Sequence, residues 1–251
     1  MAFASIEGDG VTEPEMVRPM RGHPFGEMDL VDGTVPLAGL RMLPPVLPSK
    51  VIGIGKNYAD HAAEMGADSR EPPFFFSKPA DALVPGGGEV AYPPATSNLQ
   101  HEVELVVALA RGGADIPPAR ALACVYGYAV GLDLTRRDLQ QRAKDKGHPW
   151  DMGKGFDHSA PIGALHPLAA GEHPARGSIW LRVNGQLRQN GDLAQMSWKV
   201  AEVIANLSTY VRLQPGDLIF TGTPAGVSTV TRGDLLEATV AGVGELTVRL
   251  V

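Results

Sequence analysis

The sequence HEVELVVALA at residues 101–110 and the sequence VYGYAVGLD at residues 125–133 decide the fold. Each contains a short apolar run rich in residues that favour strands, so each predicts a buried strand. The 30 glycines and 21 prolines predict frequent turns between short elements. We therefore expect an α+β fold that is rich in strands, with mixed sheets and a few peripheral helices. Further strands are expected at residues 51–55, 74–76, 218–221, 235–240 and 245–251.

Three other segments have a helical pattern, and one marks a hairpin. Residues 135–146 are polar and lack Gly and Pro, and the apolar residues of 196–207 recur at helical spacing, so both predict helices. A shorter helix is expected at residues 58–65, with Asn57 as its N-cap. The pair Asn184-Gly185 separates two strand-like runs, which is the strongest short signal for a β-hairpin. These runs are residues 179–183 and 186–188.

The first 49 residues differ from the rest of the chain. Seven prolines fall between Pro14 and Pro48, and the apolar residues there are scattered. We expect a small N-terminal segment, partly disordered, with a short strand or hairpin at residues 33–37 and a connector at residues 44–48. Residues 50–251 then form the main domain, which agrees with the length of 251 residues.

The composition argues against several kinds of partner and location. A net charge of −6 without a basic run disfavours nucleic acid and anionic membranes, because both attract basic surfaces. No apolar run is long enough to cross a bilayer, and the first ten residues lack the pattern of a signal peptide. We therefore expect a cytoplasmic protein. Cys124 is the only cysteine, so it cannot form an intramolecular disulfide, and its apolar neighbours indicate a small core residue.

Three carboxylates form the strongest chemical pattern. Glu102 and Glu104 are two residues apart on a predicted strand, so their side chains share one face. Neighbouring buried carboxylates repel each other unless one is protonated or a cation bridges them. Asp133 ends the second predicted strand, where it is well placed to join the pair. Carboxylate oxygens suit Mg²⁺, Mn²⁺ and Ca²⁺, so the three residues are a candidate metal site. Taken alone, two glutamates on a strand also fit a solvated face paired with lysines.

Seven short motifs follow one another between Lys50 and the C-terminus. They are GKNYADHAAEMG (55–66), FSKP (76–79), HEVEL (101–105), GLDLTRRDLQ (131–140), GKGFD (153–157), PGD (215–217) and TGTPAGV (221–227). In this order they resemble the catalytic domain of the fumarylacetoacetate hydrolase family. The stretches EPPFFFSKPAD (71–81) and GDL (191–193) are similar to those of its bacterial fumarylpyruvate hydrolases and acylpyruvases.

The resemblance implies a β-roll of mixed sheets, usually a homodimer, that binds Mg²⁺ or Mn²⁺, with Ca²⁺ as a further candidate in vitro. It also implies a small diketo acid as substrate. The animal enzyme adds an aspartate to its metal shell ahead of the catalytic histidine, and Lys56-Asn57 stands there in this chain. The residues that match family positions are the metal ligands Glu102, Glu104 and Asp133, the catalytic residues His61, Glu64 and Lys154, and the substrate-binding residues Arg137, Gln140 and Thr223.

The implied reaction is metal-dependent hydrolysis of a carbon–carbon bond in a 2,4-diketo acid, fumarylpyruvate or a similar acylpyruvate, to pyruvate and a carboxylic acid. His61 and Glu64 are three residues apart, so on a helix they are neighbours, and the glutamate would orient the imidazole as a general base. The spacing of four residues between Arg137 and Asp133 predicts that both face the same side. Lys78 has a weaker case and is left out of the predicted site.

Other functions also fit these residues. The same metal site would support decarboxylation of oxaloacetate, or isomerisation and decarboxylation of 2-hydroxyhepta-2,4-diene-1,7-dioate. A non-catalytic binding protein that retains the fold is a remote alternative, because it predicts loss of at least one metal carboxylate or of the pair His61 and Glu64, and all five residues are present. The sequence GIGK at residues 53–56 lacks the spacing of a nucleotide-binding loop.

Overall fold

The computed structural model describes residues 2–5, 16–22, 25, 28–38, 40–58, 71–168 and 172–251. The chain divides into two compact units, Met1–Leu43 and Pro44–Val251. The first unit contains an antiparallel sheet in which β2 pairs with each of the other three strands. These strands are β1 (Ala2–Ser5), β2 (Met16–Gly22), β3 (Met28–Leu30) and β4 (Val35–Pro36). Strand β4 lies within residues 33–37, where a strand or hairpin is predicted.

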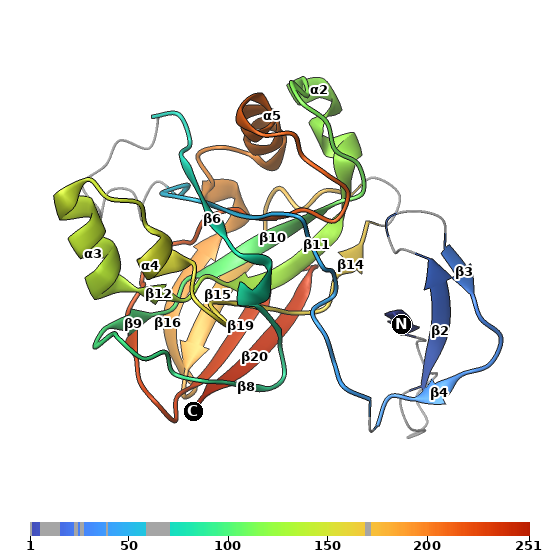
Figure 1. Ribbon diagram of the computed structural model, residues 1–251, viewed down its shortest axis with the longest axis horizontal. Coiled ribbons are helices and arrows are strands. Elements are labelled where there is room, and N and C mark those ends of the chain that lie inside the picture. The colour runs from blue at the N-terminus through green and yellow to red at the C-terminus, as the bar shows by residue number, and fades with distance from the viewer. Residues whose placement is uncertain are drawn as a thin grey trace. The chain divides into compact units, whose positions relative to one another are not determined.

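The second unit is built around an eight-stranded mixed sheet (Figure 1). Both strands predicted from residues 101–110 and 125–133 lie side by side at its centre as β10 and β11, and every residue of β10 is buried. The order is β6-β5-β17-β10-β11-β13-β7, with β14 paired to β11. The bounds are β5 (Val51–Ile54), β6 (Phe75–Lys78), β7 (Leu83–Pro85), β10 (Val103–Leu109), β11 (Val125–Leu132), β13 (Ala160–Ile162), β14 (His166–Pro167) and β17 (Leu218–Phe220).

A five-stranded sheet packs against β10 and β11 and encloses the hydrophobic core. Its order is β16-β15-β19-β20-β8, and the predicted hairpin forms its edge, with a tight turn at Asn184-Gly185. The strand before the turn alternates buried and outward-facing residues, as a half-buried strand requires. The bounds are β8 (Glu89–Val90), β15 (Ser178–Val183), β16 (Gln186–Asp192), β19 (Leu235–Val240) and β20 (Gly244–Leu250).

A third, small sheet lies next to the ends of the central strands and positions the start of a helix. Strand β9 pairs with β12 on one side and with β18 on the other. These strands are β9 (Leu99–Gln100), β12 (Thr135–Arg136) and β18 (Thr229–Val230).

The helices are peripheral, as predicted, but two begin later than expected. The helix predicted from residue 135 begins at Arg137, because Thr135 and Arg136 pair with β9 instead. The helix predicted from residue 196 begins at Val200, because Met196 caps the end of a 3₁₀ turn and forms an isolated β-bridge with Tyr58. The helices are α2 (Pro118–Ala121), α3 (Arg137–Lys146), α4 (Asp151–Lys154) and α5 (Val200–Tyr210), with 3₁₀ turns η1 (Ala80–Ala82), η2 (Leu122–Cys124) and η3 (Leu193–Gln195).

The sequence also predicts that no segment crosses a membrane and that the single cysteine lies in the core. Within the ranges that the structure describes, no helix is both long and apolar enough to span a bilayer. Cys124 is buried and has no disulfide partner, as expected for a small core residue. The helix predicted at residues 58–65 lies outside the described residues, apart from Tyr58.

Candidate active site

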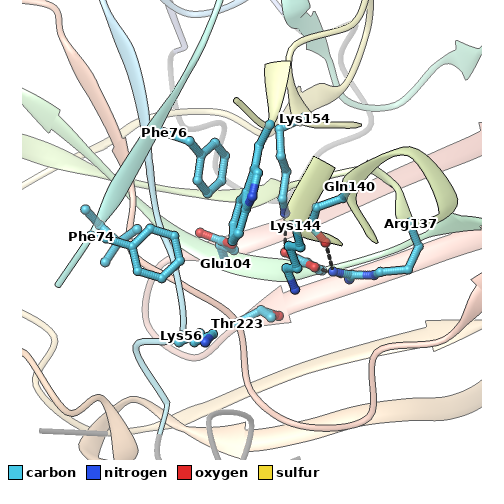
Figure 2. Close-up of a pocket in the computed structure, with 13 residues that line it drawn as sticks. Lys56, Phe74, Phe76, Glu104, Arg137, Gln140, Lys144, Lys154 and Thr223 are labelled. Carbon is cyan, nitrogen blue, oxygen red and sulfur yellow. Dashed lines mark hydrogen bonds and ion pairs between the residues drawn. The ribbon is translucent and has the colours of Figure 1, made fainter. Parts of the chain in front are cut away.

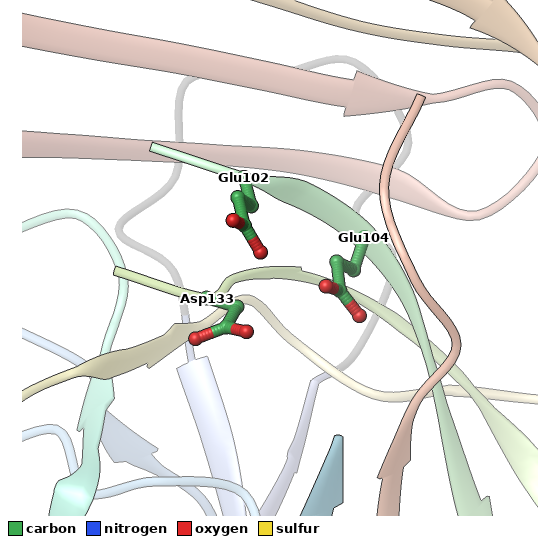
Figure 3. Close-up of side chains that lie close together, drawn as sticks. All are labelled: Glu102, Glu104 and Asp133. Carbon is green, nitrogen blue, oxygen red and sulfur yellow. The ribbon is translucent and has the colours of Figure 1, made fainter. Parts of the chain in front are cut away.

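Three buried carboxylates meet where β10 begins and β11 ends (Figure 3). Antiparallel pairing places Glu102 opposite Asp133, and the amide of Asp133 donates a 2.9 Å hydrogen bond to the Glu102 carbonyl. Glu104 lies two residues further along the same face of β10, while the alternate residues of this strand pack into the core. One oxygen from each carboxylate lies within 4.8 Å of the others. The structure therefore brings together the three acids that the sequence singled out.

Lys154 and Arg137 lie directly against this cluster. The Lys154 ammonium donates to Glu102 Oε2 at 2.8 Å, to Asp133 Oδ2 at 2.5 Å and to Thr135 Oγ1 at 2.7 Å. Burial by itself lowers the pKa of Lys154, but the charges of Asp133 and Glu102 outweigh burial, and the net pKa is raised. Arg137 forms an ion pair with Glu102 through its guanidinium. Both side chains therefore neutralise part of the negative charge.

Arg137 reaches the cluster for a different reason from the one that its spacing to Asp133 predicts. A spacing of four residues puts two side chains on one face only inside a helix, and Asp133 precedes the helix. Arg137 reaches the cluster because it is the first residue of α3, directly after the pairing of β12 with β9. In that position its Nε also donates to Gln100 Oε1 at 2.6 Å.

Lys78 belongs to the site, although the sequence interpretation left it out. Its ammonium lies 2.8 Å from Asp133 Oδ1 and is 3% exposed as a residue. It also donates to Ser159 Oγ at 2.9 Å and to the carbonyls of Ser159 and Lys154. Burial lowers the pKa of Lys78, and the charge of Asp133 opposes this shift. The sequence offered two hints of this: Lys78 lies in the family motif FSKP (76–79), and it ends a strand-like run of apolar residues.

The three acids repel one another, and the donors beside them only partly offset this repulsion. Burial raises the pKa of Glu104 well above its ordinary value, and repulsion from Asp133 and Glu102 raises it further. Lys154 and the amide of Gly222, which donates to Glu104 at 2.7 Å, only partly oppose that rise. Asp133 Oδ1 is buried without a hydrogen bond of acceptable geometry, despite the nearby Lys78 ammonium.

The donor set fits a hard divalent cation. All three side chains offer oxygen atoms, which Mg²⁺ and Mn²⁺ prefer, and no cysteine or histidine belongs to the cluster among the described residues. The spacing of the oxygens is short enough for one ion to contact all three side chains. A cation would also relieve the repulsion that raises the pKa of Glu104.

The remaining predicted residues have different positions. Gln140 is buried on α3 and accepts a 2.6 Å hydrogen bond from Arg137. Thr223 is buried after β17, and its hydroxyl donates to the carbonyl of Val103 at 2.7 Å. Both line the pocket next to the acids. The residues predicted as a water-activating pair, His61 and Glu64, lie outside the described residues.

Gln189, on the hairpin strand β16, supports the site and was not predicted. It is fully buried, and its Oε1 accepts from the Val103 amide at 3.0 Å and contacts His101 Nδ1 at 2.9 Å. Its Nε2 donates to Thr223 Oγ1 at 2.8 Å. The other ring nitrogen of His101 contacts Ser228 Oγ at 2.9 Å. This network holds the backbone on both sides of Glu102, and no local pattern in the sequence indicates it.

A pocket opens in front of the acids (Figure 2). Aromatic side chains form one wall: the Phe74 ring meets the Trp150 ring edge to face at 5.1 Å, and Phe76 lies 6.1 Å from Trp150. The rings of Phe76 and Phe74 occupy the space where side chains of Gly53 and Gly55 would lie, which explains both glycines. The other lining residues are Ile54, Lys56, Glu102, Glu104, Arg137, Gln140, Lys144, Lys154 and Thr223.

The chain is similar to known proteins over most of its length. Residues 50–251 match the family model of the fumarylacetoacetate (FAA) hydrolase C-terminal domain. The fumarylpyruvate hydrolase of Ralstonia sp is 47% identical over 178 residues, which are 71% of this chain and 92% of the relative. The mitochondrial oxaloacetate tautomerase of Rattus norvegicus is 42% identical over 193 residues, which are 77% of this chain and 87% of the relative.

Solved structures extend the similarity to three dimensions. A crystal structure of fumarylpyruvate hydrolase from Pseudomonas aeruginosa, in complex with Mn²⁺ and pyruvate, is 52% identical to this chain. The TM-score is 0.79, and the alignment covers 85% of this chain and 93% of the other. The resemblance seen in the motifs and the expected strand-rich fold are thereby confirmed.

Proposed function

Because the chain belongs to the fumarylacetoacetate hydrolase family, we propose that it hydrolyses a carbon–carbon bond in a 2,4-diketo acid, fumarylpyruvate or a similar acylpyruvate. The observation that carries this proposal is the cluster of Glu102, Glu104 and Asp133, which would hold Mg²⁺ or Mn²⁺. The Mn²⁺ and pyruvate in the similar structure from Pseudomonas aeruginosa support both the kind of ion and the product.

The reaction consumes one water molecule. The water oxygen bonds to C4 of the diketo acid, and the bond between C3 and C4 then breaks. C4 leaves as a carboxylic acid, while the electron pair of the broken bond remains on the three-carbon fragment as an enolate, which takes up a proton at C3 to give pyruvate. A divalent cation at the three acids would act as a Lewis acid toward the 2-oxo acid end of the substrate.

The side chains of this protein would share the remaining work. Arg137 lines the pocket and can donate two parallel hydrogen bonds to a carboxylate. Lys154 stays protonated beside the acids, so its charge can stabilise the negative oxygen of the enolate. His61, oriented by Glu64, would take the proton from the attacking water, and this role rests on the family motif.

The relative that is an oxaloacetate tautomerase favours a second candidate function. Keto–enol conversion of oxaloacetate needs the same stabilised enolate, but it needs no attack by water and breaks no carbon–carbon bond. Decarboxylation of oxaloacetate would release CO₂ instead of a second carboxylic acid. Product analysis therefore separates all three reactions.

The test is a panel of substrates given to the full-length protein after removal of metal. Fumarylpyruvate, acetylpyruvate and oxaloacetate are each incubated with EDTA, with Mg²⁺ and with Mn²⁺, while pyruvate, the acyl acid, CO₂ and the enol are measured. We expect equal amounts of pyruvate and acyl acid from an acylpyruvate, only when metal is present. Hydrolysis that persists in EDTA would overturn the metal mechanism, and activity on oxaloacetate alone would replace the hydrolase with the second candidate.

A further inference from the structure

The pocket contains two cationic side chains beyond those that form ion pairs with its acids. Three carboxylates face five cationic side chains among the described residues in and next to the pocket. Three of the cations, those of Lys78, Arg137 and Lys154, form ion pairs with the acids. The remaining two, Lys56 and Lys144, line the pocket without any carboxylate at ion-pair distance in the described parts of the chain.

Lys144 is held in this position by its surroundings. It lies on α3, and its ammonium stands 5.1 Å from the centre of the Trp150 ring, a favourable contact for a cation. Burial lowers the pKa of Lys144 to about 8, and the positive charges of Arg137, Lys56 and Lys154 add to the shift. The charge of Glu102 acts against this shift. An anion placed next to Lys144 would therefore relieve repulsion from three sides.

Lys56 approaches the same space from another element. It follows β5 and has a positive φ of 56°, a conformation that few residues other than glycine adopt. This backbone conformation directs the chain out of β5 at the pocket wall, and Lys56 lies near Thr223 in Figure 2. The influence of Lys56 on the pKa of Lys144 places the two charges within electrostatic reach of each other.

We propose that Lys56 and Lys144 bind a second carboxylate, at the far end of the substrate's acyl group, and that they select dicarboxylic over monocarboxylic diketo acids. The inference rests on the proposed function, in which the other end of the substrate lies at the three acids. Each ammonium has donors for a carboxylate that no described acid occupies. The rings of Phe74, Phe76 and Trp150 line the same pocket, and an aromatic wall of this kind suits a flat unsaturated chain.

Binding of matched ligands tests the proposal without turnover. The probes are 2-oxoheptanedioate and 2-oxoheptanoate, which have the same length, differ only in the terminal carboxylate, and lack the 4-oxo group needed for cleavage. Titration calorimetry in the presence of Mn²⁺ is done on the wild type, Lys56→Met, Lys144→Met and the control Lys146→Met, an exposed residue of the same helix. We expect each pocket variant to lose about tenfold or more in affinity for the diacid, as for a charge-assisted hydrogen bond.

The same variants are then compared in turnover of fumarylpyruvate and acetylpyruvate. We consider kcat/KM for fumarylpyruvate divided by kcat/KM for acetylpyruvate. This ratio should fall by about tenfold in Lys144→Met and recover in part in Lys144→Arg, and in the control it should stay within about twofold of the wild-type value. Equal losses on both substrates, or no loss of diacid binding, would overturn the proposal. If the wild type cleaves neither substrate yet prefers the diacid probe in the titration, the proposed function fails while this inference survives.

Discussion

Three acids in one buried site have two consequences: they repel one another when no metal is bound, and they can bind a metal ion. Replacing Glu104 by glutamine separates these two effects. The change Glu104→Gln removes one negative charge and keeps the shape of the side chain. Its amide oxygen can still accept the hydrogen bond from Gly222, and its NH₂ group can donate to the neighbouring carboxylates. We therefore expect the variant to keep its fold and, when both proteins are free of metal, to be more stable than the wild type. Adding metal should no longer stabilise the variant.

The distances in the site set the magnitude. At a separation of 4.8 Å and an effective dielectric constant of about 20, each pair of like charges costs about 3 kcal/mol. Glu104 is repelled by Glu102 and Asp133, and the charge of Lys154 opposes this repulsion. If Lys154 offsets one of the two pairs, about 3 kcal/mol of repulsion remains. Removing the charge should thus raise the free energy of unfolding of the metal-free protein by up to about 3 kcal/mol. For a domain of this size that is about 6–12 °C in Tm.

Metal should stabilise the wild type by a similar amount. An ion at about a hundred times its Kd contributes about 3 kcal/mol, provided that it binds only the folded state. The Tm of the wild type with Mn²⁺ and that of Glu104→Gln in EDTA should then agree within a few degrees. Circular dichroism during heating, with and without Mn²⁺, measures both values, and Glu245→Gln on an exposed strand position serves as the control. A variant that melts at or below the wild type in EDTA, and still gains stability from Mn²⁺, would refute the reasoning.

Three further perturbations follow from other contacts. Lys78→Met leaves the buried Asp133 with one cation fewer, so chemical denaturation should show a loss of about 3–5 kcal/mol; a loss under about 1 kcal/mol would mean that the ion pair is unimportant. Gly222→Ala is strained, because φ is 96° at this position and the new Cβ would lie 2.8 Å from the Cβ of Asn57. We expect Tm to fall by several degrees and the affinity for Mn²⁺ to decrease. An unchanged affinity in calorimetry would contradict this. Because only protonated Lys144 attracts a carboxylate, kcat/KM for fumarylpyruvate should decline as pH rises through about 8, and the decline should be absent in Lys144→Met.

The sequence indicated the acid cluster because its geometry is local to two strands. The alternation of side chains puts Glu102 and Glu104 on one face, and a charged residue at the end of an apolar run marks the end of a buried strand at Asp133. The prediction needed only one long-range contact, the pairing of these two strands, and strands that follow each other in sequence commonly pair. Lys154 was predicted from the family motif that contains it. Its spacing in the sequence gives no indication that it contacts the cluster.

The residues that were missed depend on contacts between distant segments. Lys78 lies 55 positions from Asp133 in the sequence, and Gln189 reaches its partners from a hairpin in the other sheet. Buried lysine and glutamine side chains resemble exposed ones in composition, so only the packed structure distinguishes them. The late start of α3 has a similar cause: pairing of Thr135 and Arg136 with β9 overrides the local helical pattern.

The balance of charge connects folding, metal and substrate. The cations of Lys78, Arg137 and Lys154 match the three acids in number, but they form ion pairs with Glu102 and Asp133 only, so the repulsion at Glu104 remains before any ion binds. All three donors of the Lys154 ammonium are already used, but each carboxylate oxygen retains lone pairs that a cation can share. Binding of a dication then makes the site positive, and an anionic 2-oxo acid can neutralise that charge. The metal would thus prepare the pocket for its substrate by attraction as well as by chemistry.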